Sequence, residues 1–111
     1  MGVTVTLCIP PRDGELCATI RFLLRADSTV MELTARHRIT EVAWDPEEKA
    51  VAILIDITNP ETSRPVDVRL DILPEDAQPP LGRTRFIGSV DRNREKLGVF
   101  GTYLGVVADE N

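Results

Sequence analysis

Hydrophobic and polar residues alternate with a period of two along most of this chain, which is typical of β-strands with one buried face. Eight segments carry the pattern, and clusters of Pro, Gly, Asp and Asn separate them. The pattern predicts strands at residues 3–9, 16–24, 29–36, 39–44, 50–58, 66–72, 85–90 and 97–107. No segment shows the 3.6-residue period of an amphipathic helix, so the sequence predicts an all-β fold.

About eight short strands with regularly spaced turns favour a single antiparallel β-sandwich, Ig-like in the loose sense, over a closed barrel. We expect one domain across residues 1–107, with 108–111 as a frayed C-terminal tail.

The apolar phase of the strands predicts which residues face the core. Within residues 50–58, the stretch from Val51 to Ile55 is apolar on both faces, as expected for a central strand that is covered on both sides. In residues 66–72, Val68, Leu70 and Ile72 alternate with polar positions, so we expect them to point inward and Asp67, Arg69 and Asp71 to face water. The same phase assigns Phe22 and Trp44 to the core.

We predict that residues 3–9 and 16–24 pair as a hairpin. In the expected register the numbers of two directly opposed residues add up to 25. This register places Cys8 opposite Cys17 and Ile9 opposite Leu16, and a slip by one residue would set apolar side chains against polar ones. We therefore expect two neighbouring free thiols.

The last predicted strand is a long apolar run interrupted by Gly98, Gly101 and Gly105, which indicates a bent edge strand. Few charges guard this edge, so we predict a contact with a protein partner or with a second copy of the chain. The candidate interface residues are Leu97, Val99, Phe100, Tyr103 and Leu104.

The net charge of −5, from 13 basic and 18 acidic residues, is opposite to that expected of a protein that binds nucleic acid through phosphates. Basic residues nevertheless gather between residues 82 and 96. They form a candidate basic loop for an acidic partner or a phosphate, with a solvated turn as the alternative: Arg83, Arg85, Arg92, Arg94 and Lys96.

Candidate chemistry is sparse. His37 is the only imidazole in the sequence. Because Arg36 and Arg38 flank it, we expect a neutral surface histidine in a strand connection. No nucleophile motif accompanies it. Two cysteines and one histidine do not make a structural zinc site. The sequence therefore predicts no catalytic residue, no metal and no cofactor.

Cysteine usage and the N-terminal sequence bear on the compartment. Two cysteines without an export signal predict a cytoplasmic protein. No apolar run approaches the roughly 18 residues of a membrane helix, so no membrane partner is expected.

The order of features in residues 66–107 resembles the C-terminal β-sandwich extension of tyrosinases, polyphenol oxidases and molluscan haemocyanins. Residues 66–70 stand for its first strand, 86–90 for its F-A-G-S motif and 97–101 for the following strand. That extension carries no copper ligand and shields the copper domain, so the resemblance implies an accessory or packing role. Together these features predict a non-catalytic module that binds another protein. The alternatives are a small enzyme, or a carbohydrate- or lipid-binding sandwich, using carboxylates at a cleft.

Overall fold

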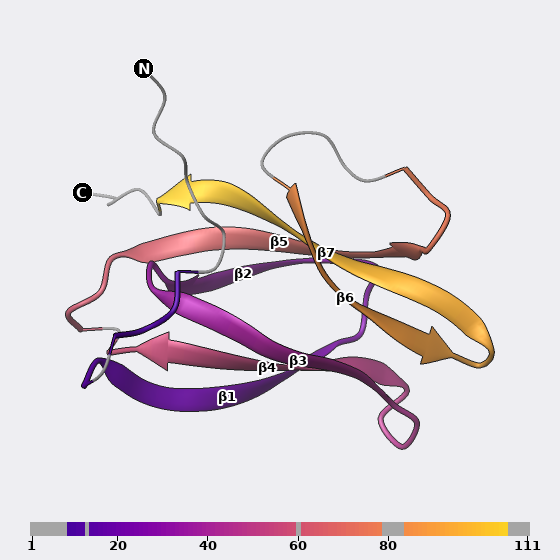
Figure 1. Cartoon of the computed structure of the whole chain (residues 1–111), viewed down its shortest axis with the longest axis horizontal. Coiled ribbons are helices and arrows are strands. Elements are labelled where there is room, and N and C mark those ends of the chain that lie inside the picture. The colour runs from indigo at the N-terminus through magenta and orange to yellow at the C-terminus, as the bar shows by residue number, and fades with distance from the viewer. Residues whose placement is uncertain (1–8, 13, 60, 79–83, 107–111) are drawn as a thin grey trace.

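Two antiparallel β-sheets pack against each other in the computed structural model of this chain (Figure 1). The structure describes residues 9–12, 14–59, 61–78 and 84–106. Within these ranges it contains no helix and seven strands: β1 (Leu16–Leu24), β2 (Ser28–Thr34), β3 (His37–Asp45), β4 (Ala50–Thr58), β5 (Pro65–Pro74), β6 (Thr84–Arg92) and β7 (Glu95–Val106). The predicted all-β sandwich is confirmed, and the described part of the chain has no helix that could cross a membrane.

The seven strands correspond to the second through eighth predicted ones. Most of the first predicted strand, the pair of Cys8 with Cys17 and the predicted tail at 108–111 lie outside the described residues. The one predicted hairpin pair that the structure describes is wrong, because Ile9 lies in no strand and Leu16 pairs with Thr58 of β4.

One sheet has the strand order β1-β4-β3 and the other the order β2-β5-β7-β6. The central place of β4 confirms the prediction from its apolar residues, since both of its edges are paired. The expected cover on both faces is not found, because Ile53 and Ile55 of the inner face are buried whereas Ala52 and Leu54 of the outer face are at intermediate exposure. β7 was expected at an edge, but it lies between β5 and β6 and is hydrogen-bonded to both. Its apolar run fits an interior strand, because Val99 is fully buried.

The inner faces of both sheets form one hydrophobic core. The predicted inward residues of β5 are buried, and Asp67 and Arg69 are on the other face at intermediate exposure. Asp71 was also expected to face water, but it is only 8% exposed, and Arg69 Nε donates a 2.9 Å hydrogen bond to its carboxylate. The buried core side chains are Leu24, Met31, Leu33, Val51, Ile53, Ile55, Val66, Val68, Leu70, Ile72, Val90, Leu97 and Val99.

The two sheets are closest where β3 packs against β6. Gly88 of β6 faces Val42 of β3 there, and a Cβ atom on the glycine would overlap Val42 Cγ2. On the other side, β2 packs against β4, so the inner face of β1 is covered less completely. Trp44 packs against the core as predicted, whereas Phe22 of β1 is 37% exposed and the prediction that it is buried is wrong.

Candidate functional site

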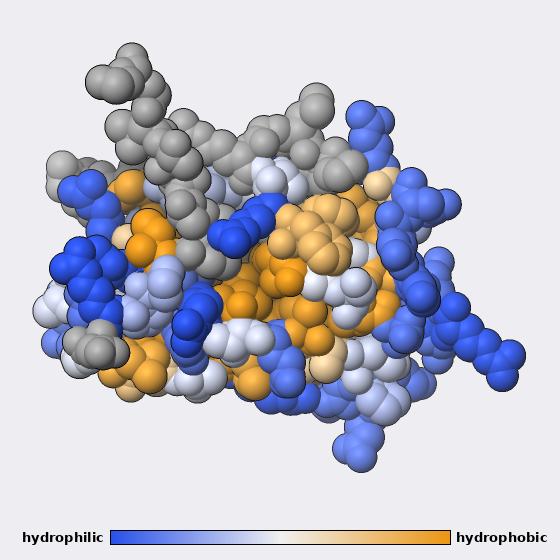
Figure 2. Space-filling model, in the orientation of Figure 1, coloured by the Kyte–Doolittle hydropathy of each residue, from blue (hydrophilic) through white to orange (hydrophobic). Residues whose placement is uncertain are grey.

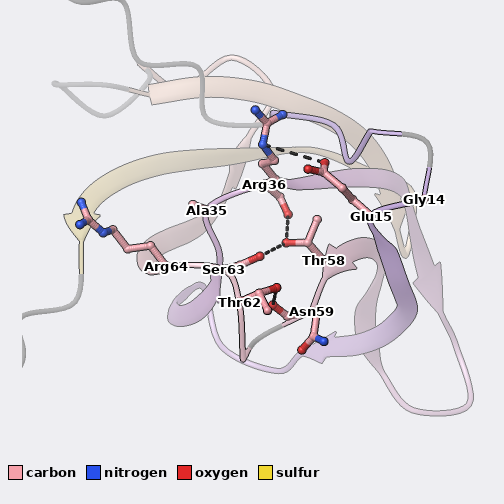
Figure 3. Close-up of a pocket in the computed structure, with 9 residues that line it drawn as sticks. All are labelled: Gly14, Glu15, Ala35, Arg36, Thr58, Asn59, Thr62, Ser63 and Arg64. Atoms are coloured by element: carbon pink, nitrogen blue, oxygen red, sulfur yellow. Dashed lines mark hydrogen bonds and ion pairs between the residues drawn. The ribbon is translucent and has the colours of Figure 1, made fainter.

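A polar hollow of about 600 Å³ lies at one end of the sandwich, where three connections meet (Figure 3). The turn before β1 supplies Gly14 and Glu15, the β2–β3 turn supplies Ala35 and Arg36, and the β4–β5 connection supplies the rest. The hollow is lined by Gly14, Glu15, Ala35, Arg36, Thr58, Asn59, Thr62, Ser63 and Arg64.

Hydroxyl groups in this hollow hold two of the connections together. The Thr58 hydroxyl donates to the Arg36 carbonyl at 3.2 Å and lies 2.5 Å from the Ser63 hydroxyl. The Thr34 hydroxyl donates to the same carbonyl at 2.7 Å, and the Ala35 amide donates to the Arg64 carbonyl at 2.8 Å. These bonds fix the end of the core, so the hydroxyls are structural groups.

The ionisable groups of the hollow do not converge on a common point. Glu15 Oε2 lies 4.0 Å from Arg36 Nε, whereas the guanidinium of Arg64 points away from the hydroxyl pair (Figure 3). Glu15 is the one carboxylate of the lining, and no histidine or cysteine accompanies Ser63 there as a base or nucleophile. The described lining of the hollow therefore brings no acid–base pair together.

His37 is not the surface histidine that its arginine neighbours suggested. Its side chain is fully buried as the first residue of β3, directly opposite Ile57. Nδ1 lies 2.8 Å from the Thr34 carbonyl, so this nitrogen carries the proton of the neutral ring. Burial lowers the pKa of His37, and the bond to Thr34 opposes that shift more weakly. Nε2 has no hydrogen-bond partner within the described ranges.

The predicted interface on β7 divides into a buried and an exposed part. Leu97, Val99 and Phe100 are buried, so they cannot present an outer contact surface. Tyr103 is half-buried, and Leu104 is 48% exposed beyond the last pair between β6 and β7. A protein contact at this end of β7 stays a prediction.

The predicted basic loop is not one patch. Arg83 lies outside the described residues, and Arg85 lies near the start of β6. Arg92 is at the end of β6, roughly 23 Å further on at about 3.3 Å per residue. There it is 3.2 Å from Glu95 and 3.9 Å from Asp27, and Arg94 and Lys96 follow in the adjoining hairpin.

The edge strand β1 presents apolar side chains that the fold leaves open. Phe22 is directly opposite Ile53 of β4, so both side chains lie on the inner face of the sheet. Ile53 is only 1% exposed, in contrast to Phe22 at 37%, and Leu16 at the start of the strand is 54% exposed. Among the described residues, β1 pairs with β4 alone, and no other described strand lies along its second edge.

An apolar hollow of about 220 Å³ extends this surface between β1 and β2. Ile20 of β1, Leu33 of β2 and Ile57 of β4 line it, together with Glu32, Thr34, Ser63 and Pro65. The hollow lies where the two sheets diverge, because β2 packs against β4 instead of β1. A side chain inserted beside β1 would therefore meet hydrocarbon on both sheets.

Hydrophobic surface also gathers on the β3–β6 side of the molecule, between hydrophilic ends (Figure 2). Phe86 of β6 is 55% exposed there, and its ring meets that of Phe100 edge-on at 5.5 Å between centroids. Pro10 lines a hollow with Ile39 and Phe86, so the chain itself occupies part of this side. Pro10 thus lies near β3 and β6. Exposed apolar side chains occur on both sides of the molecule, Phe22 and Leu16 on β1 and Phe86 on β6.

Comparison with protein families, with curated proteins and with solved structures found no match to this chain. The resemblance to a tyrosinase-type extension therefore remains a prediction. Within the described residues, no three His, Cys, Asp or Glu side chains are grouped as metal ligands.

The amino-acid sequence contains a partial signal for the β1 surface. Its pattern predicted the strand and its apolar alternation correctly, and the run from 16 to 24 contains a single charged residue, Arg21. Periodicity indicates that one face of a strand is apolar, however, and does not indicate whether another sheet covers that face. The exposure of Phe22 could be found only once β1 was placed at the sheet edge.

Proposed function

We propose that this chain is a non-catalytic β-sandwich module that assembles with another protein, and that the edge of β1 makes the contact. The observation that carries the proposal is the occurrence, at one strand, of an edge that no described strand pairs and of inward-facing side chains that the second sheet leaves partly exposed. A partner strand that adds to this edge gains main-chain hydrogen bonds and buries Phe22 and Ile20.

The proposal agrees with the accessory or packing role that the resemblance to the tyrosinase-type extension implies. The alternative of a small enzyme or ligand-binding sandwich has weaker support, because the hydroxyls of the polar hollow are already bonded within the protein. A cytoplasmic location belongs to the same proposal, since Cys17 is an exposed free thiol that suits a reducing compartment.

The experiment is site-specific photo-crosslinking in the native host. Phe22 is replaced by benzoylphenylalanine, and Phe86, which is also exposed but lies on the opposite side in β6, is replaced in the same way as the matched control. We expect a defined adduct at Phe22, with the linked peptide identified by mass spectrometry. The adduct should disappear when the edge is blocked by Thr19→Pro in a folded variant.

Two outcomes would contradict the proposal. One is the absence of any protein adduct at Phe22 while the variant is expressed and folded. The other is a Phe22 adduct that persists unchanged when Thr19→Pro blocks the edge, because the contact would then not use the backbone of β1.

A further inference from the structure

We infer that the partner at the β1 edge is a second copy of this chain, joined by antiparallel pairing of β1 with β1 about a two-fold axis. The inference rests on the proposed function and names its partner. The two three-stranded sheets would become one continuous six-stranded sheet.

β1 lacks most features by which proteins protect an edge strand. It contains no proline and no lysine, and its nine residues carry one charge, Arg21. That guanidinium already binds the Asp45 carboxylate of its own chain. The one irregularity is a register shift between Leu16 and Ala18, so the stretch from Ala18 to Leu24 is regular and free to pair.

The sequence of β1 is complementary to itself in antiparallel orientation. If the axis passes through Ile20, the two copies of Ile20 oppose each other and Ala18 opposes Phe22 of the second copy. A large ring then lies beside a small side chain at both symmetric positions, which favours close packing. The inner-face side chains of the two β1 strands then lie side by side on one face of the joined sheet, so each gains a cross-strand neighbour from the second copy.

The single charge selects this register. With the axis at Ile20, Arg21 opposes Thr19 of the second copy. Moving the axis to Arg21 would set two arginines directly opposite each other, which destabilises a strand pair. Moving it to Thr19 keeps the charges apart but shortens the overlap within the regular stretch Ala18–Leu24 from five residues, 18–22, to three, 18–20. The Ile20 register therefore has no like-charge pair and keeps the match of Ala18 with Phe22.

The register can be tested by placing a second positive charge opposite Arg21. Thr19→Arg does this at both symmetric positions. Within its own chain the new side chain lies beside Asp56, which already binds the Thr19 hydroxyl at 2.6 Å, so folding should be preserved. Thr40→Arg is the matched control, because Thr40 is an exposed threonine on β3, the other edge strand of the same sheet.

Light scattering after size exclusion and sedimentation velocity give the mass, with circular dichroism as the check on folding. We expect the wild-type protein and Thr40→Arg to have twice the 12.3 kDa chain mass. The dimer dissociation constant of Thr19→Arg should rise about tenfold, since like charges face each other twice. A wild-type monomer at millimolar concentration, or equal dimerisation of both variants, would overturn the inference.

A covalent test does not depend on the charge argument. In a chain with Cys8→Ser and Cys17→Ser, Ile20→Cys should give a disulfide-linked dimer under mild oxidation, because directly opposed Cβ atoms, about 4.5–5.5 Å apart, need only a small shift to reach the roughly 3.5–4.5 Å of a disulfide. Thr40→Cys in the same background should remain a monomer on denaturing gels. Cross-linking at Thr40 with none at Ile20 would place the interface on the wrong edge and refute the inference.

The photo-crosslinking experiment separates the two proposals. A Phe22 adduct of twice the chain mass supports the homodimer. A Phe22 adduct with a different protein, together with a monomeric wild type, leaves the proposed function standing and overturns this inference. If Phe22 gives no adduct, both fail.

Discussion

His37 is the residue whose environment differs most from what its neighbours in the sequence suggest. Arg36 and Arg38 flank it, yet the side chain begins β3 and points into the core. Its ring is tied to the β2–β3 turn through the Thr34 carbonyl, so it acts as a structural donor at the end of the sandwich. A buried neutral histidine of this kind makes stability depend on pH near neutrality.

We expect the free energy of unfolding to fall as the pH drops below about 6.5. Burial holds the pKa of His37 below its usual 6.5, so in that range the unfolded chain takes up a proton that the folded protein does not. Urea unfolding between pH 8 and 5 measures the effect. His37→Asn keeps a donor for the Thr34 carbonyl but cannot titrate, and it should flatten the profile.

Two carboxylates contribute in a separate, more acidic range. The pKa of Asp45 is lowered chiefly by the Glu48 amide, and that of Asp56 chiefly by the Thr19 hydroxyl. The stability they add is present above the usual value of 3.8 and is lost as the pH falls below it. A profile that declines only below pH 4, with His37 intact, would contradict the role assigned to the histidine.

At the scale of elements, the β6–β7 hairpin shows how local chemistry selects a turn. Asn93 has φ 48° and Arg94 has φ 71°, which is the left-handed pair of a type I′ turn. Asparagine tolerates this conformation well, whereas in arginine the Cβ atom lies too close to the following carbonyl oxygen, which is unfavourable. The hairpin therefore retains backbone strain at Arg94. Within the described residues, no ion pair of Arg94 offsets this strain.

Arg94→Gly should stabilise the protein by about 1 kcal/mol, because Asn-Gly is the preferred type I′ pair and glycine has no Cβ to crowd. The urea midpoint should rise with an unchanged denaturant slope. Arg85→Gly, within β6, is the control and should lower the midpoint, since glycine weakens a strand interior. If Arg94→Gly lowers the midpoint as well, the turn assignment is wrong.

At the scale of the whole molecule, the two sheets pack unevenly. They approach closely at β3 and β6, where Gly88 provides the space, whereas β1 has no comparable contact with the second sheet. The side of β1 is therefore called the open side. The open side is where the proposed assembly takes place.

Gly88→Ala should destabilise the protein by about 1–3 kcal/mol, because the added methyl overlaps Val42 and forces the sheets apart. Val42→Ala in the same chain should recover part of this loss, giving a coupling energy in a double-mutant cycle measured by urea unfolding. Ser89→Ala, one residue further on and exposed, should have little effect. Equal losses at Gly88 and Ser89 would contradict the close approach.

The sequence by itself determined the all-β class, the positions of seven strands and the inward phase of residues such as Leu70. These features depend on period-two patterning and turn residues, which act over a few neighbouring positions. It also identified the bend in β7: Gly105, at φ 127°, lies at the register shift opposite Asp67 and Val68.

Only the tertiary structure decided which strands lie side by side and which apolar faces are covered. Val99 and Phe22 are both apolar residues of predicted strands, yet one is enclosed between neighbouring strands and the other lies at a sheet edge. Strand pairing depends on contacts between residues far apart in the chain, and burial depends on where the second sheet ends. Three of the five residues of the interface predicted on β7 are therefore buried, whereas Phe22 and Leu16 of β1 stay exposed.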